Sequence, residues 1–297
     1  MTADCGARPQ ARSFKLMHTA DTLTVLTGET HMRQYLYETH LHTSQGSACG
    51  KSPGRDYPAI YRDLGYDGIF VTDHFFQGNC AAPRTGKWKD RVDAYMAGYE
   101  DAREAGCKVG LKVFFGIEQN YAGDEYLIYG VDREFLLEHE YIEAWSRQKL
   151  FDEVRAWGGV TLQAHPFRER GYIKKLHFTL EGIDGVEGLN MGNNPWEDVC
   201  ALKYARKLGL PVTCGSDIHN AANAVPERLA AVALDEPVNS SLDYASYIRA
   251  GKRIRFVYPA ERLEGISARL PETPWEAAGG DGQITDFRLE DYLFGDS

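Results

Sequence analysis

The chain has 297 residues and a formal net charge of −10, and 43% of its residues are hydrophobic. This composition supports a sizeable core and is unlike that of a disordered chain, while the acidic charge without a basic stripe argues against binding of long nucleic acids. No apolar run reaches the roughly 18 residues needed to span a bilayer, and the first residues lack the apolar region of a signal peptide. We therefore expect a cytoplasmic protein with no membrane partner, whose six scattered cysteines are reduced thiols.

Short runs of β-branched and aromatic residues alternate with longer helix-like stretches from residue 35 onward. This order is typical of parallel βαβ units and predicts an α/β barrel or a long open sheet. The seven strand-like runs are, in chain order, YLYETH, DGIFVTDH, KVFFGIE, EYLIYGV, GVTLQAH, GVEGLN and PVTCGSD. The main helical patterns are RVDAYMAGYEDAREAG, EFLLEHEYIEAWSRQKLFDEVRAWG and PWEDVCALKYARKLG, and each ends at glycine, which commonly follows a helix C-terminus.

Three segments lie outside this regular pattern. Residues 1–34 are predicted to form a polar N-terminal arm, with TLTVL as a short leading strand, before a barrel domain over residues 35–275. Residues 276–297 are acidic and rich in glycine at their start, which predicts a tail on the surface. The segment 75–98 is a loop entering a helix and is a candidate to cover the site. Its aromatic residues would either stack on a base or ring or pack in the core.

Polar residues stand where the strand-like runs end. His40 and His42 are two residues apart, and alternate residues of a strand face the same side, so both imidazoles can reach one ion. Each of the other polar residues at the strand ends is weak evidence for a metal site when taken alone. Together they fall where parallel α/β folds place their active sites. Imidazole and carboxylate ligands suit zinc, manganese or iron, and a bridging glutamate indicates more than one ion. The other strand-end residues are Asp73, His74, Glu118, His165, Asp217 and His219.

The ordered motifs THLHTS, TDH, GIE, AHPFR and GSDIH resemble those of the polymerase and histidinol phosphatase (PHP) superfamily, over roughly residues 35–258. The resemblance implies a distorted (β/α)7 TIM-like barrel that holds two or three divalent metal ions and hydrolyses phosphate esters. It further implies a first metal site formed by His40, His42, Glu118 and Asp217. Glu118 would bridge to a second metal that also uses His165, and His74 and His219 would serve a third.

Two positions depart from the pattern of this superfamily. Relatives with three metals often carry another histidine several residues after the first pair, where this chain reads TSQGSACGK. Asp132 stands where some relatives carry a histidine, and it is a candidate oxygen ligand. Asp73 is either a ligand or a residue that orients a neighbouring ligand.

The predicted mechanism is attack on phosphorus by a metal-activated water, with a metal or a protonated histidine stabilising the leaving group. We expect His74, His219 and Arg168 to act in catalysis. Arg168, three residues after His165, would clamp the phosphate through its planar guanidinium, unless it is an ordinary surface residue or is paired with Glu169. Other candidates for contact with the substrate are Lys51, Arg55 and Asn190.

These features predict a metal-dependent phosphoric ester hydrolase, with a small phosphorylated partner such as a histidinol-phosphate-like ester or a nucleotide. One alternative is a phosphodiesterase or exonuclease acting on short oligonucleotides or nucleoside bisphosphates. Related folds also include protein phosphotyrosine phosphatases and enzymes that cleave C–N bonds. An alternative of a different class is a non-catalytic, metal-stabilised scaffold domain, which predicts an eroded ligand set. The sequence leaves the oligomeric state open.

Overall fold

The computed structural model describes residues 33–279, 282–284 and 286–295, so almost all of the predicted N-terminal arm lies outside the described residues. The strands are β1 Tyr35–Glu38, β2 Gly68–Val71, β3 Lys112–Tyr121, β4 Asp124–Tyr129, β5 Val160–Ala164, β6 Leu176–Glu181, β7 Gly185–Asn190, β8 Val212–Gly215, β9 Ala231–Leu234, β10 Ile254–Val257, β11 Trp275–Gly279 and β12 Gly282–Ile284. The α-helices are α1 Tyr57–Asp63, α2 Trp88–Val109, α3 Arg133–Glu138, α4 Arg147–Trp157, α5 Pro195–Leu208, α6 Ser241–Arg249 and α7 Leu289–Leu293.

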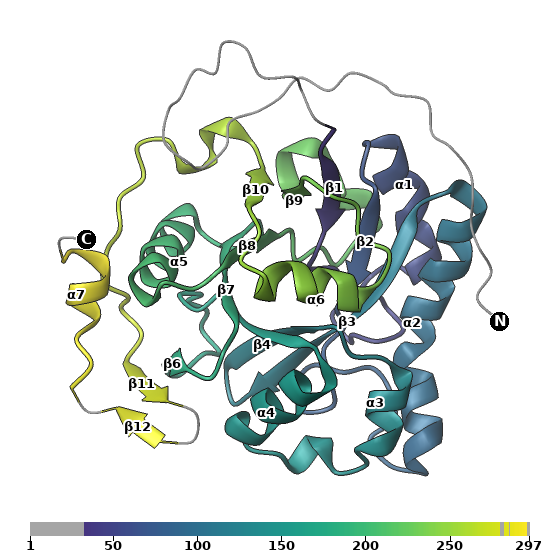
Figure 1. Ribbon diagram of the computed structural model, residues 1–297, viewed down its shortest axis with the longest axis horizontal. Helices are drawn as coiled ribbons and strands as arrows, with labels where there is room; N and C mark the ends of the chain where they lie inside the picture. The colour runs from purple at the N-terminus through teal and green to yellow at the C-terminus, as the bar shows by residue number, and fades with distance from the viewer. Residues whose placement is uncertain (1–32, 280–281, 285, 296–297) are drawn as a thin grey trace.

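The central sheet has nine strands in the order β10-β9-β1-β2-β3-β4-β5-β7-β8 and curves into a nearly closed barrel (Figure 1). A parallel bridge between Leu41 and Ile218 joins the segment after β1 to the segment after β8. The His42 N–H donates to the Ile218 carbonyl at 2.9 Å across this seam. The predicted TIM-like barrel is therefore confirmed, and all seven predicted strands are present.

Strand β4 departs from the predicted parallel arrangement, because it runs antiparallel to both β3 and β5. The turn between β3 and β4 contains Ala122 and Gly123, both at positive φ, and is too short for a helix. Strands β9 and β10 were not predicted; β9 is antiparallel to β1 and to β10. The reversal of β4 decides which of its ends faces the functional site.

The barrel interior is filled by large apolar side chains from the strands, including Phe70, Leu127 and Leu162. Helix α6 closes the end of the barrel opposite to His40, where its Tyr244 packs against Phe70. Around the barrel, helices α1 and α2 lie at the right of the view, α3 and α4 below, and α5 at the left (Figure 1). Burial of these apolar faces is the main force that holds the strands in place.

Two of the three predicted helical segments end at the glycine predicted from the sequence. Gly158 and Gly209 cap α4 and α5 in the left-handed conformation. The first pattern instead continues through Gly106 to a cap at Gly110. The pattern over residues 134–158 is divided into α3 and α4, because Ser146 begins α4 by accepting a hydrogen bond from the Lys149 N–H.

The C-terminal segment is packed on the barrel rather than forming the predicted surface tail. Strand β11 pairs in parallel with β6 and antiparallel with β12, which gives a separate three-stranded sheet. The side chains of Ala277, Leu289 and Leu293 are buried in the main core. None of the helices in the described part of the chain has the length and apolar character to cross a bilayer.

The aromatic residues of the 75–98 segment belong to the core. Phe75, Phe76 and Trp88 are buried and pack against one another, and the Trp88 indole N–H donates to the Leu136 carbonyl at 2.6 Å. Packing, rather than stacking on a substrate, therefore accounts for these three side chains.

Candidate metal centre

All seven predicted ligands meet at one end of the barrel, because most of them follow strands that run in the same direction. Glu118 lies at the centre of this cluster: its carboxylate is 3.2 Å from His40 Nε2, 3.4 Å from His42 Nε2 and 3.0 Å from His165 Nε2. Asp217 lies on the other side of the histidine pair, 3.1 Å from His42 Nε2. Nitrogen and oxygen atoms thus converge on a few small volumes.

Four overlapping sets of ligand atoms within this cluster are close enough to hold an ion, the atoms of each lying within 4.8 Å of one another. The donor chemistry fits divalent zinc, manganese or iron. The Nδ1 atom of His74 and the Oε2 atom of Glu118 are buried and lie 2.6 Å apart without a well-formed hydrogen bond, and a bound cation would satisfy both atoms. The sets are His42, His74 and His219; His40, His165 and Asp217; His40, His42 and Glu118; and His74, Glu118 and Glu125.

The backbone at two of the ligands is in a conformation that non-glycine residues rarely adopt. His165 has φ 27° and follows β5 directly, and Asp217 has φ 54° two residues after β8. Such local backbone strain is concentrated at functional sites. Gly215 permits the approach of β8, because a Cβ there would lie 2.5 Å from that of His40.

Glu125 is a candidate ligand that the sequence analysis missed, and its place follows from the reversed direction of β4. As the second residue of β4, it pairs with Ala164, and its carboxylate lies 3.5 Å from His165 Nε2 and 3.7 Å from His74 Nδ1. Asp132, predicted as a possible ligand, follows the far end of the same strand. It is exposed and caps α3 by accepting from the Phe135 N–H at 2.9 Å, so the structure separates it from the cluster.

Buried carboxylates and hydroxyls hold the histidine rings. Glu187, from the middle of β7, lies 2.8 Å from His40 Nδ1 and was not predicted. Asp73 accepts a hydrogen bond from Ser47 Oγ, which in turn lies 3.1 Å from His42 Nδ1. Both contacts leave the Nε2 atom of the ring directed at the cluster, an arrangement usual for metal-binding histidines. Of the two predicted roles for Asp73, the structure favours orientation of a neighbouring ligand.

Neighbouring charges in the cluster shift the pKa values of its histidines and carboxylates. Burial opposes a charge on His40, but Glu187, Asp217 and Glu118 outweigh it and raise the pKa of this imidazole well above its ordinary value. Burial likewise disfavours the ionised Asp217, yet Arg168 and His40 hold its pKa well below the usual range. Without bound ions Asp217 is therefore ionised and His40 is protonated. His42 differs, because burial and the neighbouring His219 and His74 hold the pKa of its imidazole well below the ordinary value.

Arg168 lies against the cluster and is paired with Asp217 rather than with Glu169. Its Nη1 atom is 2.6 Å from the Asp217 carboxylate, and only 11% of its side chain is exposed. Its Nε and Nη2 atoms each donate at 2.8 Å to the side-chain oxygens of Asn193 and Asn190, respectively. These contacts fix the plane of the guanidinium beside the ligands.

The other predicted substrate contacts fall in different places. Asn190 is buried and holds Arg168, so it acts on the site through that side chain. The side chain of Arg55 is 65% exposed and pairs with Asp101 at 3.6 Å, where it is occupied by a surface ion pair. Lys51 is exposed, and its backbone N–H donates to the His219 carbonyl at 2.7 Å.

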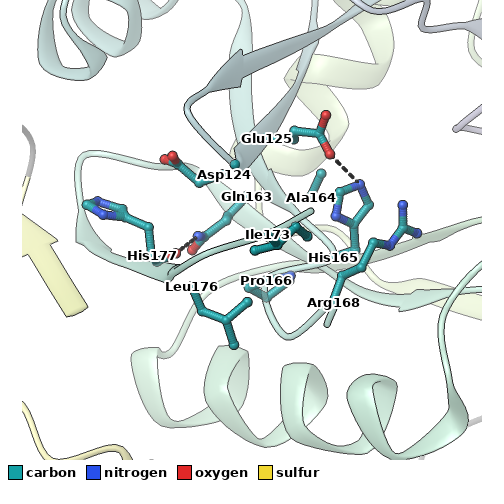
Figure 2. A pocket seen from close by; sticks show the side chains of 11 residues that line it. Asp124, Glu125, Gln163, Ala164, His165, Pro166, Arg168, Ile173, Leu176 and His177 are labelled. Carbon is teal, nitrogen blue, oxygen red and sulfur yellow. Dashed lines mark hydrogen bonds and ion pairs between the residues drawn. The ribbon is translucent and has the colours of Figure 1, made fainter. Parts of the chain in front are cut away.

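A small pocket opens beside the ligands His165 and Glu125 (Figure 2). Glu125, His165 and Arg168 group on one side of it, and Leu176 and His177 lie on the other (Figure 2). Pro166, Ile173 and Leu176 give this space an apolar wall. The free space in this pocket is no larger than about one water molecule, so it gives a ligand at the metal cluster a neighbouring surface and no room for a second group.

No family model and no curated protein matches the chain. Among solved structures, PsfC from Pseudomonas syringae superposes with a TM-score of 0.53 at 16% identity, over 78% of this chain and 94% of that one. A two-domain protein containing a predicted PHP-like metal-dependent phosphoesterase, from Bacteroides vulgatus, gives 0.50 at 15% identity, over 84% of this chain and 70% of that one. The chain has the fold of the PHP-like phosphoesterases. The resemblance predicted from the motifs is confirmed at this level.

A weaker match is the lesion-specific endonuclease EndoQ from Pyrococcus furiosus, with a TM-score of 0.45 at 12% identity, over 75% of this chain and 58% of that one.

Proposed function

We propose that the protein is a metal-dependent phosphoesterase that hydrolyses a small phosphate monoester. The observation that carries this proposal is the convergence of His40, His42, Glu118, His165 and Asp217 on shared volumes at the end of the barrel. A scaffold domain would not need a complete set of buried ligands, which is costly to maintain without bound ions. The complete ligand set therefore favours an enzyme over a scaffold.

The predicted ligands would form three metal positions. His40, His42, Glu118 and Asp217 would hold a first divalent ion, Glu118 and His165 a second, and His74 and His219 a third. Glu125 reaches the second position. When bound, such ions supply a water of lowered pKa and neutralise phosphoryl oxygens. Glu118 is the only carboxylate of the described residues that contacts histidines on every side of the cluster, which suits it to bridge two ions.

Arg168 and the outer histidines would act on the substrate. The guanidinium of Arg168 is already oriented by Asn190 and Asn193 and retains N–H groups for a phosphoryl oxygen. His219 is 30% exposed and His74 is 12% exposed, so both can reach a leaving group. An imidazole that holds the third ion cannot donate a proton from the same nitrogen, so general acid catalysis by His74 or His219 would apply when only two ions are bound.

The pocket beside His165 favours a substrate with a compact leaving group. This space is far smaller than an ordinary ligand pocket, so it leaves no room for a bulky group next to His165. The net charge of −10 also opposes the approach of a long polyanion. Short diesters remain the principal competing substrate class.

The test is a panel of phosphomonoesters and short phosphodiesters, assayed with manganese, zinc or iron(II). We expect hydrolysis of monoesters that falls by about a thousand-fold or more in His40→Ala and Asp217→Asn, because a lost ion removes several kcal/mol of transition-state stabilisation. Arg55→Ala serves as the surface control and retains activity. Full activity in both ligand variants would refute the metal mechanism, and turnover confined to diesters would replace the monoester assignment.

A further inference from the structure

We infer that the buried ion pair between Arg262 and Asp198 positions the guanidinium of Arg168, which the proposed mechanism places on the phosphoryl group. Arg262 lies in the short 3-10 helix Ala260–Leu263 after β10, and Asp198 lies in the first turn of α5. Neither residue belongs to the ligand sets of the cluster. Because the role of Arg168 belongs to the proposed function, this inference rests on that function.

The ion pair is almost completely buried. The side chain of Arg262 is 10% exposed and that of Asp198 is 0% exposed, and Arg262 Nη2 lies 2.6 Å from Asp198 Oδ2. Arg262 Nε donates to the same oxygen at 2.8 Å. A buried pair of charges needs further hydrogen bonds to offset its lost hydration, and both residues make these bonds to one loop.

That loop covers residues 190–194 between β7 and α5. Arg262 Nη2 donates to the carbonyl oxygens of Asn190 and Asn193 at 2.7 Å and 3.0 Å, respectively. From the other side, Asp198 Oδ1 accepts from the Asn190 backbone N–H at 3.1 Å and from Asn193 Nδ2 at 2.9 Å. The ion pair therefore fixes the backbone at both asparagines and the side-chain amide of Asn193.

The same two asparagines orient Arg168. Their side-chain oxygens accept from Arg168 Nη2 and Nε, each at 2.8 Å. The amide of Asn193 presents its oxygen to Arg168 because its nitrogen is held by Asp198. The amide of Asn190 is directed in the same way, since its nitrogen donates to Glu187 Oε2 at 2.9 Å.

The contact with Asp217 does not by itself fix the plane of this guanidinium. It engages only Nη1 of Arg168, at 2.6 Å, and a group held at one nitrogen can still rotate about that contact. The two asparagine oxygens supply the further points that define the plane. Loss of the ion pair would release the loop and thereby misalign Arg168 with a phosphoryl oxygen.

A double-mutant cycle on kcat/KM, with a phosphomonoester that the protein hydrolyses, tests this link. Arg262→Ala should lower kcat/KM by about 10- to 100-fold, because misplacement of a positioned group by about 1 Å can cost a hundredfold. In an Arg168→Ala background the same change should alter kcat/KM by less than about twofold, since no guanidinium is left to misalign. The pair Arg262→Met and Asp198→Asn leaves no unpaired buried charge and should show the same dependence on Arg168.

Arg155→Ala is the matched control. Arg155 also joins an aspartate to a backbone carbonyl, because its Nη2 atom lies 2.9 Å from Asp184 Oδ1 and 2.8 Å from the Gly182 carbonyl oxygen. The carboxylate of Asp184 in turn accepts from the N–H of Thr161 near the start of β5, whereas His165 follows the end of that strand. This variant should keep the kcat/KM of the unchanged protein.

A second measurement does not depend on turnover. The Nε–H of Arg168 is shielded in its bond to Asn193 and should give a resolved nitrogen–proton NMR signal, assigned by its loss in Arg168→Lys. In Arg262→Ala this signal should shift and exchange faster with water, while the rest of the spectrum shows that the protein is folded. In Arg155→Ala the signal should stay unchanged.

A loss of kcat/KM that is equal with and without Arg168, or an Nε–H signal unchanged in Arg262→Ala, would overturn the inference and leave the proposed function intact. A protein that hydrolyses no phosphate ester but shows the changed signal would refute the proposed function and support the positioning of Arg168.

Discussion

On the inner side of the cluster, His40 is fully buried and its Nδ1 contacts the buried carboxylate of Glu187 at 2.8 Å. On the outer side, His219 is 30% exposed, and its Nδ1 lies 2.9 Å from the Asp217 carbonyl oxygen and 3.5 Å from the Asp217 carboxylate. The inner ligands stand at the ends of barrel strands and are oriented by side chains from neighbouring strands. The outer ligand His219 contacts the loop over residues 43–51 through its backbone, since its carbonyl accepts a hydrogen bond from the Lys51 N–H at 2.7 Å. A carboxylate behind the ring raises its basicity and fixes its tautomer, so we expect ions to bind more tightly on the inner side.

Removing the charge of Glu187 tests this difference most strongly. Glu187→Gln should weaken binding of the inner ion by about 10- to 100-fold, since loss of a residue that orients a ligand typically has this cost. Competition with a chelator measures the change. The control is Glu197→Gln, another fully buried carboxylate, which caps α5.

The control variant should lower thermal stability and leave metal affinity unchanged. Equal weakening by Glu187→Gln and Glu197→Gln would mean that general destabilisation, not the contact with His40, controls the affinity.

The pH dependence of metal binding tests the state of the inner ligand His40. His40 has a pKa raised well above its ordinary value by Glu187, Asp217 and Glu118, against the effect of burial. Its imidazole is therefore protonated in the ion-free protein at neutral pH, and an ion must displace that proton. Affinity should fall by about tenfold for each unit of pH lowered from about 8 towards about 6.

Calorimetry in two buffers of different ionisation enthalpy gives the number of protons released. Glu187→Gln should release fewer protons and show a shallower pH dependence, because the main charge that raises the pKa of His40 is gone. An unchanged proton release in this variant would contradict the assignment.

The smallest expected effects come from substitutions at Glu125 and Asp132, which lie near opposite ends of β4. Glu125→Gln should weaken binding of the second ion by a few-fold, on the order of 1 kcal/mol, because Glu125 lies 3.5 Å from His165 Nε2. Asp132→Ala should cost about 1 kcal/mol of stability through loss of the α3 cap, with no effect on metal content. Thermal denaturation and metal analysis of both variants check this pair, and metal loss in Asp132→Ala would contradict the placement of that residue.

The ligands that end parallel strands could be predicted from the sequence, because an apolar run that stops at His40 or His165 signals both the strand and the side of the barrel it faces. Glu125 could not be assigned in the same way, since its position depends on the direction of β4, which the Ala122–Gly123 turn reverses. The motif NYAGDE between two strand-like runs is nonetheless a hairpin signal.

Glu187 was hidden for a different reason. It lies in the middle of β7, where the run GVEGLN gives no sign that its single charge faces the ring of His40. Such a contact between distant segments depends on the closed barrel and leaves no local pattern.

The bridge between Leu41 and Ile218 closes the barrel beside His40, His42 and Asp217, so an ion held by these residues would link the beginning of the barrel to its end. A ribosome must release the chain beyond residue 219 before this link can form, so nascent chains hold only part of the ligand set. Such an ion would stabilise the closed barrel by mass action, and the stability of the folded protein would then rise with the metal supply in its surroundings.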